Sequence, residues 1–187
     1  MNTVVYLDMD GVLCDFVAGA KIAHGKDIPH NDCRWGLEEQ FGLTPEEFWT
    51  PLGYEFWANL PWTSEGYLLL SGIEALFGDR VVLMTSPCDT PGGVEGKVKW
   101  IKKNLPRYSK RFFVGPPKHL AAGPGKILLD DHEVNCDRFI THGGRALLVP
   151  RPWNRRRMET DKDGNFQILN VLGELGWPCD EDTQAGG

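Results

Sequence analysis

The fold of this chain is set near its start by residues 4–12, which read Val4-Val5-Tyr6-Leu7-Asp8-Met9-Asp10-Gly11-Val12. The first four are apolar without interruption, which is typical of a strand buried on both faces of a parallel sheet. Side chains two positions apart on an extended strand point to the same side, so Asp8 and Asp10 can face one site where the strand ends. Gly11 allows the chain to turn sharply there. The stretch therefore predicts a buried strand that leads into a functional loop.

Further apolar runs repeat this pattern at residues 81–84, 127–129 and 146–149, with a weaker run at 111–114. Residues 94–105, between two of these runs, have a helical pattern. The alternation of strand and helix predicts an α/β fold with a parallel sheet. In such sheets functional residues gather just beyond the C-terminal ends of the strands. On the predicted helix Val94, Val98, Ile101 and Leu105 share one face, and Lys97, Lys99, Lys102 and Lys103 mostly avoid it.

The interval 15–63 interrupts this alternation. It is rich in aromatic residues and contains helix-like stretches at 16–24 and 45–49, the second opened by Thr44 and Glu47 in a capping-box pattern. We expect a small helical cap at 15–63, inserted after the first strand of a catalytic core formed by residues 1–14 and 64–178. The acidic, small and polar residues 179–187 are expected to form a flexible tail.

Composition and charge exclude several classes of protein. The net charge of -6 argues against binding to a nucleic-acid polymer, which normally needs a basic excess, but leaves small anionic substrates open. The five Cys are scattered without CxxC spacing, which indicates a reducing compartment and neither a disulfide framework nor a zinc site. No apolar run approaches the length that spans a membrane, and the first residues lack the basic and apolar segments of a secretion signal. We expect a cytoplasmic protein, and a monomer and a homodimer both stay open.

Asp8 and Asp10 together suit phosphoryl transfer. That reaction needs a nucleophile, a proton donor for the leaving oxygen and cations that neutralise the phosphoryl oxygens. Two adjacent carboxylates can fill the first two roles and also hold Mg²⁺. The alternatives are a strand-end turn with solvated carboxylates, or a calcium loop. The calcium loop fails on spacing, because it needs Gly at about the sixth position, and Gly11 is in the fourth.

The ends of other predicted strands carry matching groups. Thr85 and Ser86 follow the second strand and could donate hydrogen bonds to a phosphoryl oxygen, although such residues before a proline commonly just form turns. Asp130 and Asp131 stand at the end of the fourth strand. Two neighbouring carboxylates there would repel each other unless a cation lies between them and other carboxylates. A lysine should balance this charge. Lys118 is the first choice and Lys97 the second, with a solvated surface position as the alternative for both.

These residues resemble the motifs of the haloacid dehalogenase-like phosphatases: residues 8–12, Thr85, a lysine, and Asp130-Asp131. The resemblance implies a Rossmann-like three-layer core with a strand order of 5-4-1-2-3, a Mg²⁺ cofactor and a phospho-aspartate intermediate. A closer likeness, to the 5'(3')-deoxyribonucleotidases, rests on DMDGVLCDF (8–16), FWANLP (56–61), Thr85-Ser86-Pro87, Gly96-Lys97 with Trp100, ILLDD (127–131) and Pro152-Trp153-Asn154.

The resemblance also implies roles for these residues. Asp8 would attack phosphorus and bind Mg²⁺, and Asp10 would protonate the leaving oxygen, later activate water and offer its backbone carbonyl to the metal. Asp131 would be the third protein ligand, Asp130 would support metal-bound waters, and Thr85 and Lys118 would hold the phosphate.

Aromatic residues at places similar to the nucleobase site of that family are Phe16, Trp35 and Trp49. Their faces would stack on any base. The alternative is that the aromatic residues form the core of the insertion itself. One departure is Asp89, which stands near a position where the similar proteins have a lysine. The sequence thus predicts a Mg²⁺-dependent phosphomonoester hydrolase acting on nucleoside monophosphates, with a sugar-phosphate phosphatase and a non-catalytic nucleotide-binding protein as alternatives.

Overall fold

The computed structural model describes residues 3–115 and 117–178, and it contains a five-stranded parallel sheet. The strand order is β3-β2-β1-β4-β5, which confirms the predicted order 5-4-1-2-3 read from the other edge. Tyr6 at the centre of the sheet pairs with Val82 on one side and Leu128 on the other. The five predicted apolar runs are the five strands: β1 (Val4–Leu7), β2 (Val81–Thr85), β3 (Phe112–Val114), β4 (Lys126–Asp130) and β5 (Arg145–Leu148).

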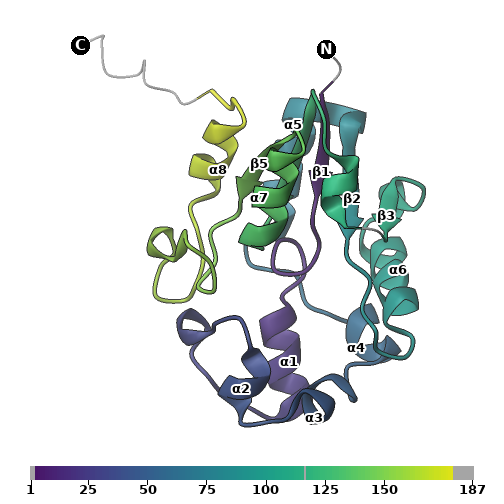
Figure 1. Cartoon of the computed structure of the whole chain (residues 1–187), viewed down its shortest axis with the longest axis vertical. Coiled ribbons are helices and arrows are strands. Elements are labelled where there is room, and N and C mark those ends of the chain that lie inside the picture. Colours follow the sequence, from purple (N-terminus) through teal and green to yellow (C-terminus); the bar gives the residue numbers. More distant parts are fainter. Residues whose placement is uncertain (1–2, 116, 179–187) are drawn as a thin grey trace.

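Helices cover both faces of the sheet, which explains why the strands are apolar throughout. Alternate residues of β1 pack in opposite directions: Val5 and Leu7 join one core cluster, and Tyr6 joins Phe139 in another. Figure 1 shows the resulting layers. The first cluster packs against α5 (Gly66–Phe77), α6 (Gly93–Asn104) and α8 (Ile168–Glu174), and the second against α7 (Glu133–Thr141).

Residues 15–63 form helices next to the C-terminal ends of the strands (Figure 1). They have a small hydrophobic cluster of their own, in which Phe48 and Leu52 are fully buried. The predicted capping box is present, because Thr44 and Glu47 each accept a hydrogen bond from the backbone N–H of the other. The elements are α1 (Phe16–His24), η1 (His30–Asp32), α2 (Leu37–Phe41), α3 (Pro45–Trp49) and α4 (Tyr54–Ala58).

We propose that residues 15–63 form a cap on a core made of residues 1–14 and 64–178. Helix α4 packs against α6, and Trp57 of α4 belongs to the main core cluster, so the last part of the interval is attached to the core. The predicted tail, 179–187, lies outside the described residues. The remaining short helices are η2 (Gly78–Arg80), η3 (Pro106–Tyr108), η4 (Lys118–Ala121) and η5 (Arg157–Glu159).

Helix α6 packs only partly as predicted. Ile101 and Leu105 of the predicted face are buried, but Val94 and Val98 are only half-buried, and the buried side extends to Gly96, Lys97 and Trp100. The reason is the close approach of α4: a Cβ at Gly96 would lie 2.6 Å from the backbone oxygen of Tyr54. The prediction that Lys97 avoids the buried face is therefore wrong, and its side chain reaches the interior.

The structure also describes the state of the cysteines and the length of the apolar helices. In the described part of the chain Cys14, Cys33, Cys88 and Cys136 are free thiols. No helix within 3–115 or 117–178 combines the length and apolar character needed to cross a bilayer.

Candidate active site

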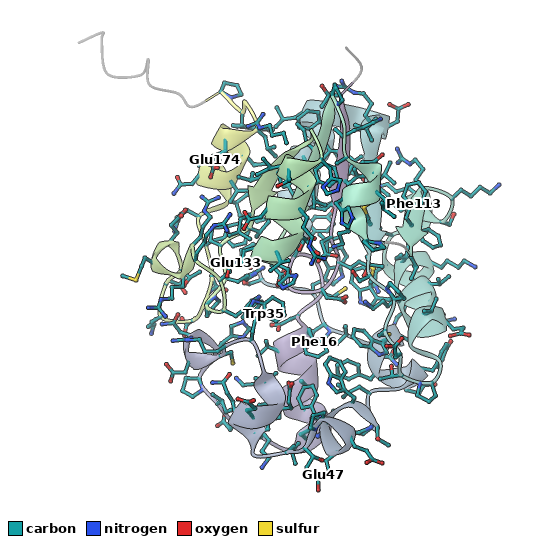
Figure 2. The ribbon with its side chains drawn as sticks, viewed as in Figure 1. Phe16, Trp35, Glu47, Phe113, Glu133 and Glu174 are labelled. Atoms are coloured by element: carbon teal, nitrogen blue, oxygen red, sulfur yellow. The ribbon has the colours of Figure 1, made fainter. Side chains whose placement is uncertain are left out.

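The C-terminal ends of β1, β2 and β4 meet at one edge of the sheet, and a cavity of about 610 Å³ opens there. All the candidate residues line it except Thr85, which is buried directly behind Asp10. Figure 2 shows Phe16 and Trp35 between the cap helices and this edge. The candidates that line the cavity are Asp8, Asp10, Phe16, Trp35, Trp49, Ser86, Lys97, Lys118, Asp130 and Asp131.

Three buried carboxylates form the floor of the cavity. Asp8, Asp130 and Asp131 each offer an oxygen atom, and these three atoms lie within 4.8 Å of one another. Lys118 Nζ lies between two of them, 2.6 Å from Asp8 Oδ1 and 2.6 Å from Asp130 Oδ2. One lysine cannot neutralise three carboxylates, so this cluster has room for a further positive charge.

The hydrogen bonds of the three carboxylates separate their roles. Asp130 is fully engaged, since it also accepts bonds from the backbone N–H of His132 and from Asn135. Asp8 Oδ2 and Asp131 Oδ1 accept no hydrogen bond from the described residues. Asp8 and Asp131 are therefore the better candidates for metal ligands, and Asp130 holds Lys118 and the start of α7 in place.

Burial and mutual repulsion raise the pKa values of two of these groups. Burial, with repulsion from Asp130 and Asp10, raises the pKa of Asp8 to about 7, although Lys118 opposes the change. Burial also raises the pKa of Asp131, helped by Asp130 and Asp8 and opposed by the indole N–H of Trp153. Burial lowers the pKa of Lys118, but the attraction of Asp130 and Asp8 outweighs it and raises the pKa overall. A bound cation would stabilise the ionised form of both carboxylates.

A second buried lysine holds Asp10. Lys97 Nζ lies 2.5 Å from Asp10 Oδ2 and donates to Thr85 Oγ1 at 3.1 Å and to the backbone oxygen of Ser86 at 2.8 Å. Thr85 also donates to Asp10 Oδ2, at 3.2 Å. The lysine lies over the ring of Trp57, 4.5 Å from its centroid, and is 2% exposed. Both candidate lysines therefore reach the cavity. Lys97 pairs with Asp10, whereas Lys118 pairs with Asp8 and Asp130.

Gly11 is required by the approach of the first loop to Asp131. Its φ is +75°, and a Cβ there would lie 2.2 Å from Asp131 Oδ2. The buried side chain of Arg151 donates from Nε to the backbone oxygen of Gly11 at 2.6 Å and pairs with Glu65 at 3.2 Å. These contacts fix the loop that carries Asp10 against the metal-ligand candidate Asp131.

The aromatic residues divide between the two predicted alternatives. Phe48 belongs to the cap's own cluster. Phe16, Trp35 and Trp49 line the cavity, and Phe16 stacks on Trp49 with ring centroids 5.8 Å apart. Phe16 also packs against both hydrophobic clusters and stacks on Trp57, so it belongs to the core as well as to the cavity. Trp35 is 54% exposed, so packing within the cap does not account for it.

Other residues at the cavity contact the carboxylates, although the sequence did not indicate a role for them. Trp153 donates from Nε1 to Asp131 Oδ2 at 2.6 Å, and Asn135 bonds to Asp130. The rule that functional residues follow strand ends also applies to Trp153, which comes shortly after β5. His132, two residues after the end of β4, fits the same rule, whereas Arg34 lines the cavity without a comparable signal in the sequence.

Known proteins share this fold. A hydrolase from Pseudomonas syringae (14% identity, 92% of this chain and 97% of the other, TM-score 0.51) has a similar structure. So has an L-2-haloacid dehalogenase (11%, 94% and 99%, TM-score 0.51). A third is a protein provisionally named a β-phosphoglucomutase from Thermotoga maritima (17%, 92% and 99%, TM-score 0.51). No protein-family profile and no curated protein matches the chain. The chain thus has the Rossmann-like fold of haloacid dehalogenases and related hydrolases.

Proposed function

We propose that this protein is a Mg²⁺-dependent phosphomonoester hydrolase that works through an aspartyl-phosphate on Asp8, and that it is a 5'(3')-deoxyribonucleotidase acting on nucleoside monophosphates. The observation that carries the proposal is the cluster of Asp8, Asp130 and Asp131, with oxygen atoms within 4.8 Å of one another at the ends of β1 and β4. Fold alone does not set the reaction, since unrelated reactions occur on one fold. The charges of the site support the proposed reaction.

The donor set fits Mg²⁺. It offers only oxygen atoms, and Asp8 Oδ2 and Asp131 Oδ1 are free to bind while Asp130 is held by Lys118 and Asn135. When bound, Mg²⁺ would supply positive charge next to the phosphoryl oxygens. Asp8 and Asp131 would bind it, with the backbone carbonyl of Asp10 as a further ligand.

The side chains account for both halves of the reaction. In the first, an Asp8 carboxylate oxygen attacks phosphorus, the bond to the leaving oxygen breaks, and Asp10 gives that oxygen a proton. In the second, Asp10 takes a proton from a water that attacks phosphorus, which releases inorganic phosphate and restores Asp8. The Lys97 contact suits the second half, because it holds the Asp10 side chain in place at the cavity. In the first half a phosphoryl oxygen would take the place of Asp10 as the partner of Lys97 and Thr85.

The cavity supports a substrate larger than phosphate. Its volume of about 610 Å³ is that of a site for a whole small molecule. Phe16 and Trp49 stack within it, and Trp35 contributes an exposed ring. A nucleobase would find aromatic faces here while its phosphate reaches Asp8, whereas a hexose phosphate would leave these faces unused.

The test is a panel of monophosphates with Mg²⁺ and with a chelator. We expect phosphate release from deoxyribonucleoside monophosphates to exceed that from glycerol phosphate and hexose phosphates by at least an order of magnitude, and the chelator to abolish it. Equal rates across the panel would favour the sugar-phosphate alternative. Tight nucleotide binding without phosphate release would favour the non-catalytic alternative.

A further inference from the structure

We infer that Trp153 is a positioning residue that holds Asp131 ready for Mg²⁺ and connects it to the cap. The inference rests on the metal site of the proposed function and goes beyond it, because it joins the metal ligand to the part of the protein that would close over the substrate. Two features of Trp153 carry it: the hydrogen bond of its indole N–H, and the place of its ring.

The indole N–H fixes one oxygen of Asp131. Trp153 Nε1 donates to Asp131 Oδ2 at 2.6 Å, and that oxygen packs against Gly11, where even a Cβ would be too close. Asn154 holds the backbone on the same side, donating from Nδ2 to the backbone oxygens of Asp131 and Val149 at 2.8 Å each. With Oδ2 engaged and the backbone fixed, Oδ1 is the oxygen left to bind a metal. Hydrogen bonds of this kind to metal-binding groups typically change metal affinity 10–100-fold.

The indole ring touches the cap. The cap's hydrophobic cluster consists of residues between 16 and 56, with one exception among the described residues: Trp153 packs against it from the core. The ring centroid lies 5.8 Å from that of His30 and 6.5 Å from that of Trp35. One side chain therefore contacts both the cap and a candidate metal ligand.

Neighbouring contacts also join the cap to the segments that carry Asp131 and Trp153. Trp35 packs edge-on against His132, with centroids 4.6 Å apart, and His132 follows Asp131 directly in the chain. Arg34 donates to the backbone oxygen of Pro152 at 3.3 Å. The cap segment around residues 30–35 thus lies on the loop that holds Asp131. A shift of this segment moves Trp153, and the indole N–H then no longer fixes Asp131.

Binding of Mg²⁺ and placement of the cap are therefore coupled, and such coupling acts in both directions. A cap that has closed on substrate favours the geometry that binds the metal. The bound metal in turn favours the closed position of the cap segment at 30–35.

The test uses the full chain and Mg²⁺ alone, with binding measured by isothermal titration calorimetry. Trp153→Phe keeps an aromatic ring and removes the N–H, and we expect its Mg²⁺ dissociation constant to rise about tenfold. Trp62→Phe is the matched control, since Trp62 packs on Trp100 away from the cavity, and its Mg²⁺ affinity should not change. Melting temperatures without metal show that both variants fold.

Trp35→Leu tests the connection to the cap and does not depend on a buried substitution, because Trp35 is largely exposed. We expect it to weaken Mg²⁺ binding two- to threefold in the original protein and not at all in Trp153→Phe. Trp49→Leu, on the same cavity but without a ring contact to Trp153, should leave Mg²⁺ binding unchanged in the absence of nucleotide.

Equal Mg²⁺ affinity of Trp153→Phe and the original protein would overturn the inference and leave the proposed function standing. If the original protein did not bind Mg²⁺ at all, both would fail. A Trp35→Leu effect that simply adds to that of Trp153→Phe would overturn the connection to the cap.

Discussion

Lys97 Nζ lies 2.5 Å from Asp10 Oδ2, and the lysine is almost fully buried while the Asp10 side chain is 25% exposed. The cation is therefore fixed by the protein, and the carboxylate faces the cavity. Lysines are rarely buried unless they are paired. The cost of burying Lys97 is offset by Asp10, Thr85, the Ser86 carbonyl and the Trp57 ring together.

Lys97→Met should remove this support from Asp10. We expect phosphate release to fall about 10²–10³-fold, within the usual contribution of general acid–base catalysis, and the free energy of unfolding to fall by about 1–3 kcal/mol because buried acceptors lose their donor. Lys99→Met on the exposed side of the same helix is the control and should change neither. Steady-state kinetics and urea unfolding measure both effects, and equal activity of the two variants would refute the role of Lys97.

Gly11→Ala should disrupt the metal site through sterics. The substitution adds a methyl group 2.2 Å from Asp131 Oδ2 at a φ of +75°, and we expect a loss of about 2–5 kcal/mol from backbone strain and overpacking together. Gly25→Ala separates the two causes, because its φ is +60° and nothing lies within 4 Å of the added methyl group. That control should cost only about 1–2 kcal/mol and leave Mg²⁺ binding intact. Thermal unfolding and calorimetry of the two variants provide the comparison; similar losses of stability would mean that contact with Asp131 is unimportant.

The metal-free protein should become less stable as the pH rises from about 4 to about 7. The pKa of Asp8 is raised from 3.8 to about 7, and that of Asp131 is also raised, so over this range the folded state binds more protons than the unfolded state. The free energy of unfolding then falls with rising pH, and the loss is complete above the folded pKa. Asp8→Asn should flatten this slope. Urea unfolding at several pH values with a chelator measures it, and a slope unchanged in Asp8→Asn would contradict the assignment.

Mg²⁺ should reverse this loss. Because it binds ionised carboxylates, it should stabilise the protein more at pH 8 than at pH 5. At a concentration 100 times the dissociation constant, the stabilisation should be about 2.7 kcal/mol. Ca²⁺ and Na⁺ at matched ionic strength serve as controls in the same melting experiment. Equal stabilisation by Na⁺ would show that screening, and not a bound divalent ion, relieves the cluster.

Trp49→Ala should affect nucleotides and spare small esters. Loss of one stacking ring is expected to cost about 1–3 kcal/mol, which is a 5- to 150-fold fall in kcat/KM for a deoxyribonucleoside monophosphate. Hydrolysis of glycerol phosphate, which has no base, should not change. A parallel fall for both substrates would show that Trp49 supports the fold of the cap and not the base.

The sheet and the acid cluster could be predicted from sequence because both follow from local rules. The continuous apolar runs identify buried parallel strands, and parallel strands bring their C-terminal ends to one edge, so Asp8, Asp130 and Asp131 had to meet. The side of α6 that faces the core could be predicted only in part, because Ile101 and Leu105 are buried as expected but Lys97 is buried as well. It depends on the tight contact of Gly96 with α4, a tertiary feature that overrides the pattern of valines.

The role of Trp153 shows a second limit of the sequence. Its position shortly after β5 marks it as a candidate, but its hydrogen bond to Asp131 and its contact with the cap depend on how three separate segments pack. The aromatic residues show a third limit of the sequence, because core packing and ligand stacking both favour the same residue types. Only the burial of Phe48 and the exposure of Trp35 separate the two.

The central claim is that Asp8 is the nucleophile, and Mg²⁺-dependent phosphate release by Asp8→Asn tests it most directly. The amide keeps the size of the side chain but cannot form the phosphorylated intermediate. We predict that release from a deoxyribonucleoside monophosphate falls below detection in this variant, while circular dichroism shows that the fold is retained. Phosphate release that persists in folded Asp8→Asn at a rate near that of the original protein would contradict the mechanism.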